Sequence, residues 1–513
     1  MAEVSRTARV IQNAKVALFF YCINLILQFF SRKVFLDCLG AELLGLNTTA
    51  QNLLQFLNLA ESGIGAAVAF ALYKPLSQGN RQEIIDIVSL QGWFYRWVGL
   101  FVIAGSVVLM AFFPWIFAKA EVPLIYAYGT FITFLIGALL GYYVNYKIIV
   151  LSADQKEYKI TIETQGIKII KIFIQMLAIW KLSHGYVWWM ILEVIAALFT
   201  SYRLGQTINK EYPWLKTNIS EGYRLKRSYS GVLVKTKQLF FHKLGGFVFT
   251  QTTPLVIYGF TNLKTVAVYG NYMLIMIGCQ ALVEVFSRGF NASVGNLVAN
   301  GDKKTIKRVF LEIVTIRIFT AGLICLCIHE LSSSFIKLWV GPEYVLPYWP
   351  MTFLVLIYFI QMSRTSDIFL GAYGLFQDIW APVCECILNL CLSISLGYVW
   401  GISGIFFGVL VSQVVVVVCW KLYFLSTKGF KESMATNAVL YTKKIFLLLC
   451  SIAISGFLFD FLFCLKIDSF SDWIESSLFL IITYFFIGTG IFYGFDRDFR
   501  SLISRFITIW KLK

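Results

Sequence analysis

Charge is scarce in this chain of 513 residues. Charged residues make up 14% of it, against roughly a quarter in ordinary soluble domains. The sequence also contains only 3 histidines and 9 prolines, and its 37 glycines follow no period. Collagen-like and disordered classes are excluded, because aromatic residues are plentiful and glycine and proline are scattered. The low charge excludes a soluble enzyme.

Metal and cofactor sites are not expected. The histidines, His184, His242 and His329, lie far apart, and the 11 cysteines fall mostly inside apolar stretches. Cys325-Leu-Cys327 and Cys384-Glu-Cys386 lack the two-residue gap and the second pair of a zinc or redox site. These cysteines are typical of small buried hydrophobic residues.

Apolar residues fill most of the sequence: 58% of it is hydrophobic and 17% aromatic. Because a membrane-spanning helix needs about 20 apolar residues, the composition predicts an all-α polytopic membrane protein with about 14 spans. Outer-membrane strands are shorter and alternate in polarity, so helices are favoured. The expected spans are approximately 11–36, 44–73, 85–114, 123–146, 156–181, 185–209, 231–262, 265–297, 304–330, 345–372, 375–400, 402–426, 437–464 and 471–495.

The formal net charge of +16 does not indicate nucleic acid as a partner. Lysine and arginine concentrate in every second connection between the spans, as they do in cytoplasmic loops of membrane proteins. This predicts that both termini are cytoplasmic. The basic N-terminal stretch resembles the start of a signal peptide, but the long apolar run after it has no small-residue cleavage site, so it is expected to remain as the first span.

Two similar halves are expected on either side of a polar connection. The segment starting at Leu43 aligns with the segment starting at Ala267, and each helix ends in a similar turn, Gly79-Asn80 or Gly301-Asp302. A duplicated unit with an even number of spans predicts two six-helix bundles related by an axis along the membrane normal. The expected divisions are 1–209, a cytoplasmic linker at 210–230, a second bundle at 231–426, and two further spans with a tail at 427–513.

Charges in the middle of a span cost several kcal/mol, so they mark a pathway or a partnered pair. Lys168 and Lys171 are three residues apart and would repel on one helix face, so they need water or an anionic partner. His242 beside Lys243 adds a group that titrates near neutral pH. The other midspan cations are Arg96, Arg288, Arg317 and Arg364.

Midspan carboxylates form the second group of candidates. Glu61 and Glu284 lie at nearly equivalent places in the two repeats, and a carboxylate lining a bundle is typical of coupling to a proton or sodium ion. Packing against a nearby cation is the alternative. Arg364 and Asp367, like Glu284 and Arg288, share a helix face and would neutralise each other. Glycines after Glu61, including Gly63, would allow the second span to bend.

The stretch from Arg32 to Pro75 resembles the N-terminal signature of bacterial oligosaccharide (O-antigen) flippases of the Wzx type. The matching pieces are Arg32, Leu39-Gly40, Leu44-Gly45-Leu46-Asn47, Leu59-Ala60-Glu61-Ser62-Gly63-Ile64-Gly65 and Leu72-Tyr73-Lys74-Pro75. These proteins belong to the multidrug/oligosaccharidyl-lipid/polysaccharide (MOP) exporter superfamily and resemble MATE transporters in fold. The close match covers about 45 residues and carries over only Arg32 and Glu61 from the motif.

The resemblance implies transfer of an undecaprenyl-pyrophosphate-linked sugar unit across the bacterial inner membrane, before a polymerase builds O-antigen of lipopolysaccharide or capsule. A diphosphate head is strongly anionic, so cations in a cavity would compensate its charge while the polyprenyl tail stays in lipid. The expected cationic cavity consists of Arg32, Lys168, Lys171, Lys243, Arg288 and Arg317. Glu61, Glu284 and His242 are the candidates for coupling to a proton or sodium counter-ion.

Two other functions compete with this one. A drug or cation exporter of the same fold would favour an acidic or aromatic cavity, which the excess of midspan lysine and arginine argues against. A membrane-embedded polysaccharide polymerase or glycosyltransferase would place catalytic residues on a large outer loop. Every outer connection expected here is short, and Asp37 and Glu42 in the first have no further catalytic groups around them. We therefore expect a transporter rather than an enzyme.

Overall fold

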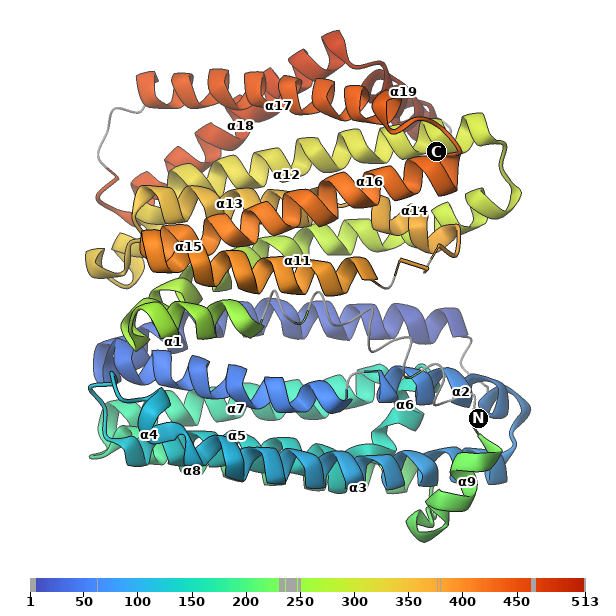
Figure 1. Cartoon of the computed structure of the whole chain (residues 1–513), viewed down its shortest axis with the longest axis vertical. Helices are drawn as coiled ribbons and strands as arrows, with labels where there is room; N and C mark the ends of the chain where they lie inside the picture. Colours follow the sequence, from blue (N-terminus) through green and yellow to red (C-terminus); the bar gives the residue numbers. More distant parts are fainter. Residues whose placement is uncertain are drawn as a thin grey trace. The chain divides into compact units, whose positions relative to one another are not determined.

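The computed structural model of the chain describes residues 6–61, 63–229, 236, 247, 251–375, 377–378, 380–462 and 467–511. These residues are nearly all helical, which confirms the predicted all-α class. The chain divides into two compact units, Met1–Ala267 and Val268–Lys513. The first unit therefore continues past the expected linker at 210–230 and ends within helix α11 (Leu263–Asn300). Figure 1 shows that each unit is a bundle of long helices.

The first unit begins with a long broken helix, α1 (Arg6–Asn58). Gly40 interrupts it with a φ of 82°, which matches the expected gap between the first two spans. The second expected span, 44–73, is itself broken: a 3₁₀ turn η1 (Leu59–Glu61) follows α1, and α2 starts after Gly63, whose φ is 101°. Left-handed backbone of this kind suits glycine because it has no Cβ atom. The remaining elements of this unit are α2 (Ile64–Gln78), α3 (Arg81–Ala111), α4 (Phe113–Ile116), α5 (Leu124–Tyr143), η2 (Asn145–Ile148), α6 (Ile149–Ala153), α7 (Glu157–Lys181), α8 (Gly185–Glu211), η3 (Ile219–Glu221) and α9 (Gly222–Ser228).

Close packing in the first unit involves residues of the recognised motif. Helix α7 packs against both α1 and α8. Asn47 accepts a hydrogen bond of 2.7 Å from the hydroxyl of Tyr186 on α8. Gly45 lies directly against the backbone of Leu263, where a Cβ atom would stand 1.9 Å from the carbonyl oxygen. The motif segment therefore has a structural role as well as any functional one.

The second unit contains helices from α12 onward. These elements are α12 (Lys303–Trp339), η4 (Pro342–Tyr344), α13 (Tyr348–Ser363), α14 (Ser366–Ala372), α15 (Trp380–Gln413), η5 (Val414–Trp420), α16 (Lys421–Phe424), η6 (Leu425–Phe430), α17 (Met434–Leu462), α18 (Phe470–Phe495) and α19 (Arg497–Lys511). Helix α15 folds back on itself at Gly401, which has a φ of 59°, and Ser393 Oγ donates to the carbonyl of Ile405 at 3.2 Å. This break separates the expected spans 375–400 and 402–426. Both η5 and η6 are π-helices.

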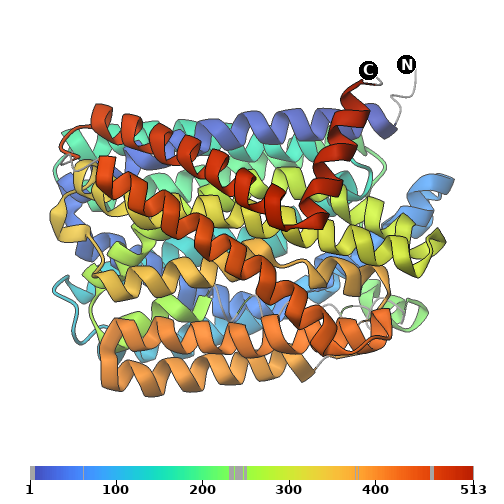
Figure 2. The same ribbon diagram turned by 90° about the horizontal axis from the view of Figure 1, so that it is seen from above.

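The last two expected spans, α17 and α18, pack against α12. The hydroxyl of Tyr484 donates to the carbonyl of Phe319 at 3.0 Å. Lys444 is almost fully buried and contacts Asp496 and Asp498, each at 2.7 Å. The chain turns sharply at Asp496, and Figure 2 shows α19, the dark red helix that ends near the C-terminus, at a steep angle to α18. The buried ion cluster thus ties the end of α18 to α17.

Each turn of the proposed repeat ends in a residue whose side chain caps the next helix. Asn80 caps α3 and accepts from the backbone N–H of Glu83 at 3.2 Å. Asp302 caps α12 and accepts from the backbone N–H of Thr305 at 3.4 Å. Such caps satisfy a free N–H group at a helix start. The two turns that align in the sequence therefore each begin a helix with a capping side chain.

Nine helices in the described part of the chain are long and apolar enough to cross a membrane. Two of them, Gln12–Asn58 and Trp380–Phe430, each contain a glycine break. The first helix includes most of the expected span 11–36 and the first part of 44–73, and the second includes most of 375–400 and all of 402–426. The expected span 156–181 corresponds to α7, which is not among the nine because it is more polar. The expected spans 231–262 and 265–297 include residues outside the described ranges.

Candidate functional site

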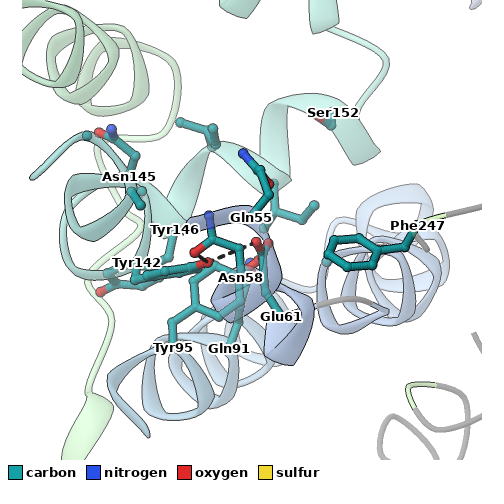
Figure 3. Close-up of a pocket in the computed structure, with 16 residues that line it drawn as sticks. Gln55, Asn58, Glu61, Gln91, Tyr95, Tyr142, Asn145, Tyr146, Ser152 and Phe247 are labelled. Atoms are coloured by element: carbon teal, nitrogen blue, oxygen red, sulfur yellow. Dashed lines mark hydrogen bonds between the residues drawn. The ribbon is translucent and has the colours of Figure 1, made fainter. Parts of the chain in front are cut away.

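A polar cavity of about 580 Å³ lies within the first unit. It is formed by η1, the end of α1, α3, α5 and the short elements after α5. Figure 3 shows the side chains around it. The lining residues are Gln55, Asn58, Glu61, Gly65, Gln91, Tyr95, Gly137, Ala138, Gly141, Tyr142, Asn145, Tyr146, Ile148, Ile149, Ser152 and Phe247. Among the described residues that line it, the one acidic group is Glu61, which is also one of the residues predicted for ion coupling.

Glu61 reaches the cavity because the helix breaks beside it. The 3₁₀ turn η1 ends at Glu61, and Gly63 then adopts a left-handed conformation that starts α2. An uninterrupted helix would satisfy its own backbone groups and place this side chain in a regular helical row. The break instead places the half-buried carboxylate between α3 and α5.

Two tyrosines approach the carboxylate of Glu61. The hydroxyl of Tyr95 on α3 donates to Glu61 Oε1 at 2.7 Å. The hydroxyl of Tyr142 on α5 lies 2.9 Å from Asn58 Oδ1 and 3.5 Å from Glu61 Oε2. Because a hydroxyl has one hydrogen, Tyr142 donates to the nearer amide oxygen. Figure 3 shows Tyr142, Asn58 and Glu61 gathered on one side of the cavity.

Gln91 adds an acceptor oxygen to the cavity. It is 2% exposed, it lines the cavity, and its Oε1 atom has no hydrogen-bond partner among the described residues. A buried acceptor left without a partner costs about 1–3 kcal/mol. Together with Glu61 and Asn58, it supplies a group of oxygen acceptors suited to a proton or a small cation. The chemistry of this cavity is that of a cation acceptor.

Two of the predicted cations, Arg32 and Arg317, form hydrogen bonds with backbone carbonyl groups. In the part of the chain described, none of the predicted lysines and arginines lines this cavity. Arg32 donates to the carbonyl oxygen of Ala267 at 3.1 Å. Arg317, in the second unit, donates through Nη1 to the carbonyl oxygen of Arg364. Arg32, which belongs to the same unit as Glu61, therefore does not line the cavity of that unit.

Lys168 and Lys171 both lie on α7, and an anionic partner neutralises one of them. Lys171 Nζ is 2.6 Å from Glu193 Oε1 on α8. Gln175 donates to the other carboxylate oxygen of Glu193 at 3.0 Å. Lys168, half-buried one turn away, makes no ion pair within the described residues. Within the described residues, Lys171 rather than Lys168 is thus the lysine of this pair that forms an ion pair.

Four of the remaining candidates have side chains outside the described part of the structure. His242 and Lys243 lie outside the described residues. Glu284 and Arg288 belong to α11, but their side chains lie outside the described part of the structure. The expected pairing of Arg364 with Asp367 is confirmed, with Nε 2.7 Å from Oδ2.

Sequence reasoning missed most of the cavity around Glu61. Tyr95, Tyr142, Asn58 and Gln91 lie within apolar stretches and carry no charge, so they did not stand out among the midspan residues. The signal that could have found them is the presence of side-chain amides in helices expected to cross a membrane, because each buried amide needs a partner.

Comparisons with known proteins identify the fold. No family model matches the chain, and no curated protein sequence matches it. Among solved structures, an inward-facing multidrug resistance MATE family transporter of the MOP superfamily aligns with a TM-score of 0.63 at 11% identity, over 79% of this chain and 95% of that one. The lipid II flippase MurJ, in an inward closed conformation, aligns with a TM-score of 0.62 at 14% identity, over 96% of this chain and 100% of that one. A MATE protein in a bent conformation gives a TM-score of 0.52 at 12% identity, over 84% and 100%. The chain therefore has a MATE-like transporter fold, as the sequence resemblance implied.

Proposed function

We propose that this protein is a flippase for undecaprenyl-pyrophosphate-linked oligosaccharides. It moves them from the cytoplasmic to the periplasmic leaflet of the bacterial inner membrane, where a polymerase uses them for O-antigen or capsular polysaccharide. The observation that carries the proposal is the fold likeness to a lipid II flippase over 96% of this chain and all of that one. The motif from Arg32 to Pro75 adds independent support from the sequence.

In this proposal, midspan cations bind the negatively charged diphosphate of the substrate. A diphosphate carries more than one negative charge, and entering a low-dielectric bundle without compensation is costly. Lys168 is half-buried on α7 without an ion pair among the described residues, so it can bind an incoming phosphate without giving up a partner. Lys171 is held by Glu193 at 2.6 Å and keeps the local charge balanced when the substrate leaves.

In this proposal the coupling ion binds in the cavity around Glu61. Its oxygens come from Glu61, Asn58 and Gln91, and it contains no cation among its lining residues in the described structure. A proton or sodium ion entering there would neutralise the carboxylate and change its bond to Tyr95. Because Glu61 ends η1 at the break before α2, that change acts on the packing of a broken helix. The downhill ion would thereby drive alternating access.

The direct test is deletion of the gene in its host, followed by assignment of lipid-linked units to a membrane leaflet. We expect complete units to accumulate on the cytoplasmic leaflet and surface polysaccharide to disappear. Re-expression of the wild-type protein should remove the accumulated units and restore surface polysaccharide. Units that reach the periplasmic leaflet but stay unpolymerised would assign the protein to a later enzymatic step and overturn the proposal.

A second function is favoured by one observation. The cavity of the first unit combines an acid with Tyr95, Tyr142 and Tyr146 and contains no lysine or arginine among the residues described. An acidic, aromatic cavity is the environment that an organic cation prefers, so the alternative is a MATE-like drug or cation exporter. The same deletion strain separates the two: an exporter would leave surface polysaccharide intact and increase sensitivity to cationic drugs.

A further inference from the structure

A second cavity, of about 340 Å³, lies within the second unit and differs in chemistry from the first. Hydrophobic side chains form most of its wall, and a group of charged residues stands at one side. The apolar residues come from α12, α13, η5, α16 and α17: Ile318, Phe359, Ile360, Val417, Val418, Leu422, Met434, Ala438 and Ile445. The charged residues are Arg364, Asp367 and Lys421, and hydroxyls of Ser363, Thr365, Ser366, Tyr441 and Thr442 complete the lining.

One carboxylate bridges the two cations of this cavity. Asp367 Oδ2 lies 2.7 Å from Arg364 Nε, and Asp367 Oδ1 lies 2.6 Å from Lys421 Nζ. The three groups together carry one positive charge in excess. The side chain of Asp367 is 37% exposed, against 26% for Arg364 and 15% for Lys421. Asp367 is therefore the group of the three that is most open to an entering molecule.

Arg364 keeps its position through bonds that do not involve Asp367. Its Nη1 donates to Gln361 Oε1 at 3.0 Å, and Gln361 donates to Gln413 Oε1 at 2.7 Å. Gln413 in turn donates to Glu385 Oε1 at 3.4 Å. This chain of side chains holds the guanidinium through Nη1, whereas Asp367 contacts Nε. If Asp367 moved away, Arg364 would remain directed at the cavity.

The backbone around Lys421 is also unusual. The π-helix η5 precedes α16, which starts at Lys421, and the second π-helix η6 follows it. Val417, Val418 and Cys419 of η5 line the cavity. π-Helical turns are rare, and they occur frequently at functional sites because they displace side chains from a regular helical row. Here η5 places an apolar wall beside the ammonium group of Lys421.

We propose that this cavity binds the phosphate group of a lipid-like molecule. The phosphate lies between Arg364 and Lys421 and the adjoining chain lies on the apolar wall. In the empty state Asp367 occupies the place of the phosphate. A phosphate or diphosphate carries more negative charge than a carboxylate and offers more acceptor oxygens, so it displaces Asp367 from both cations. The inference rests on the proposed function, whose substrate has such a head group.

A labelling experiment on the unaltered protein tests this site. Cys419 is exposed and lines the cavity, whereas Cys391 on α15 is exposed and does not line it. Full-length protein in nanodiscs of neutral lipid is treated with N-ethylmaleimide, and the labelling rates of both cysteines are followed by mass spectrometry. We expect farnesyl diphosphate to slow labelling of Cys419 about tenfold at saturation and to leave Cys391 unchanged.

Separate arms identify the source of the phosphate. Protection of Cys419 by inorganic pyrophosphate alone supports a site for the free head group, and protection by phosphatidylglycerol supports a phospholipid. Protection by farnesyl diphosphate without the other two supports an isoprenoid substrate. Equal protection by farnesol, which has the chain without the phosphate, overturns the proposal. Absence of protection by every phosphate compound overturns it as well.

Variants test the roles of the three charged residues. We expect Arg364→Gln and Lys421→Gln each to weaken binding of the protecting compound about tenfold, because each removes a charge-assisted bond. Asp367→Asn should tighten binding, a gain that misfolding cannot produce. Lys337→Gln is the matched control, since Lys337 is an exposed cation of the same unit outside the cavity. Weaker or unchanged binding in Asp367→Asn contradicts the displacement of the carboxylate.

This experiment separates the site from the function of the whole protein. Binding is measured without transport, so a cavity that binds farnesyl diphosphate through Arg364 and Lys421 stands even where the deletion strain exports polysaccharide normally. The converse result is cytoplasmic accumulation of units in the deletion strain together with no protection of Cys419. It would support the flippase function and contradict the proposed binding site.

Discussion

Tyr95 and Glu61 are joined by a hydrogen bond of 2.7 Å between the tyrosine hydroxyl and Glu61 Oε1. The bond connects a 3₁₀ turn at the end of α1 with the middle of α3. A tyrosine hydroxyl donates to an ionised carboxylate, and such a bond is stronger than one between neutral groups. Loss of the negative charge at Glu61 therefore weakens the link between the break in the first unit and α3.

Replacement of Glu61 should uncouple transport from the ion gradient. We expect an imposed proton or sodium gradient to accelerate lipid transfer by the wild-type protein in liposomes. The Glu61→Gln variant should lose this acceleration. Tyr95→Phe keeps the carboxylate and removes one charge-assisted bond, so it should lower the gradient-driven rate about tenfold. The measurement is the transfer of a fluorescent lipid-linked sugar between leaflets.

Tyr128→Phe is the matched control for Tyr95→Phe. The Tyr128 hydroxyl lies in the same unit and donates to the carbonyl of Met110 at 3.2 Å, away from the cavity. It should keep its response to the gradient. Full gradient dependence in Glu61→Gln would remove Glu61 from the coupling mechanism.

The two lysines of α7 should have different roles: Lys171 stabilises the protein and Lys168 binds the substrate. Lys171→Gln leaves Glu193 without its cation, so we expect a loss of about 3 kcal/mol in stability, and the double variant Lys171→Gln with Glu193→Gln should recover most of it. Lys168→Gln breaks no ion pair among the described residues and should remain stable while surface polysaccharide declines. Thermal unfolding and polysaccharide yield at equal protein levels check both. Equal thermal stability of the two single variants would contradict this division.

The sequence predicts helices here more completely than it predicts the cavities. Apolar runs locate the helices, and the expected separation near Trp400 corresponds to the break at Gly401, because a glycine with positive φ ends a helix without steric cost. The cavity of the first unit depends on Tyr95 and Tyr142, which are uncharged and lie 34 and 81 residues from Glu61. No local pattern relates residues at such separations, because their meeting is set by the packing of helices.

The environment of Lys444, a charged residue, could not be predicted from the sequence either. The expected span 437–464 contains it near one end, where a lysine normally reaches water. In the structure its side chain is 2% exposed and held by Asp496 and Asp498 at 2.7 Å each. These partners follow α18, so they become neighbours only when α17 and α18 pack together.

Removal of this buried cation should destabilise the second unit. Lys444→Met leaves two carboxylates close together without compensation, and we expect a loss of about 3–5 kcal/mol. Lys443→Met is the matched control, since Lys443 is the adjacent residue and is exposed. Thermal unfolding of the detergent-solubilised protein measures both. A melting temperature of Lys444→Met equal to that of the control would show that the cluster contributes nothing.

Gly45 provides a test of whether the motif acts through packing. An added Cβ atom would stand 1.9 Å from the carbonyl oxygen of Leu263 and 2.5 Å from its carbonyl carbon, so the backbone would have to move. We expect Gly45→Ala to cost about 1–3 kcal/mol. At Gly166 in α7 the same atom meets nothing within 4 Å, so Gly166→Ala should stabilise the helix by about 0.5–1 kcal/mol. Opposite shifts of the two melting temperatures support a packing role, and a stable Gly45→Ala that loses transport would instead assign the glycine to function.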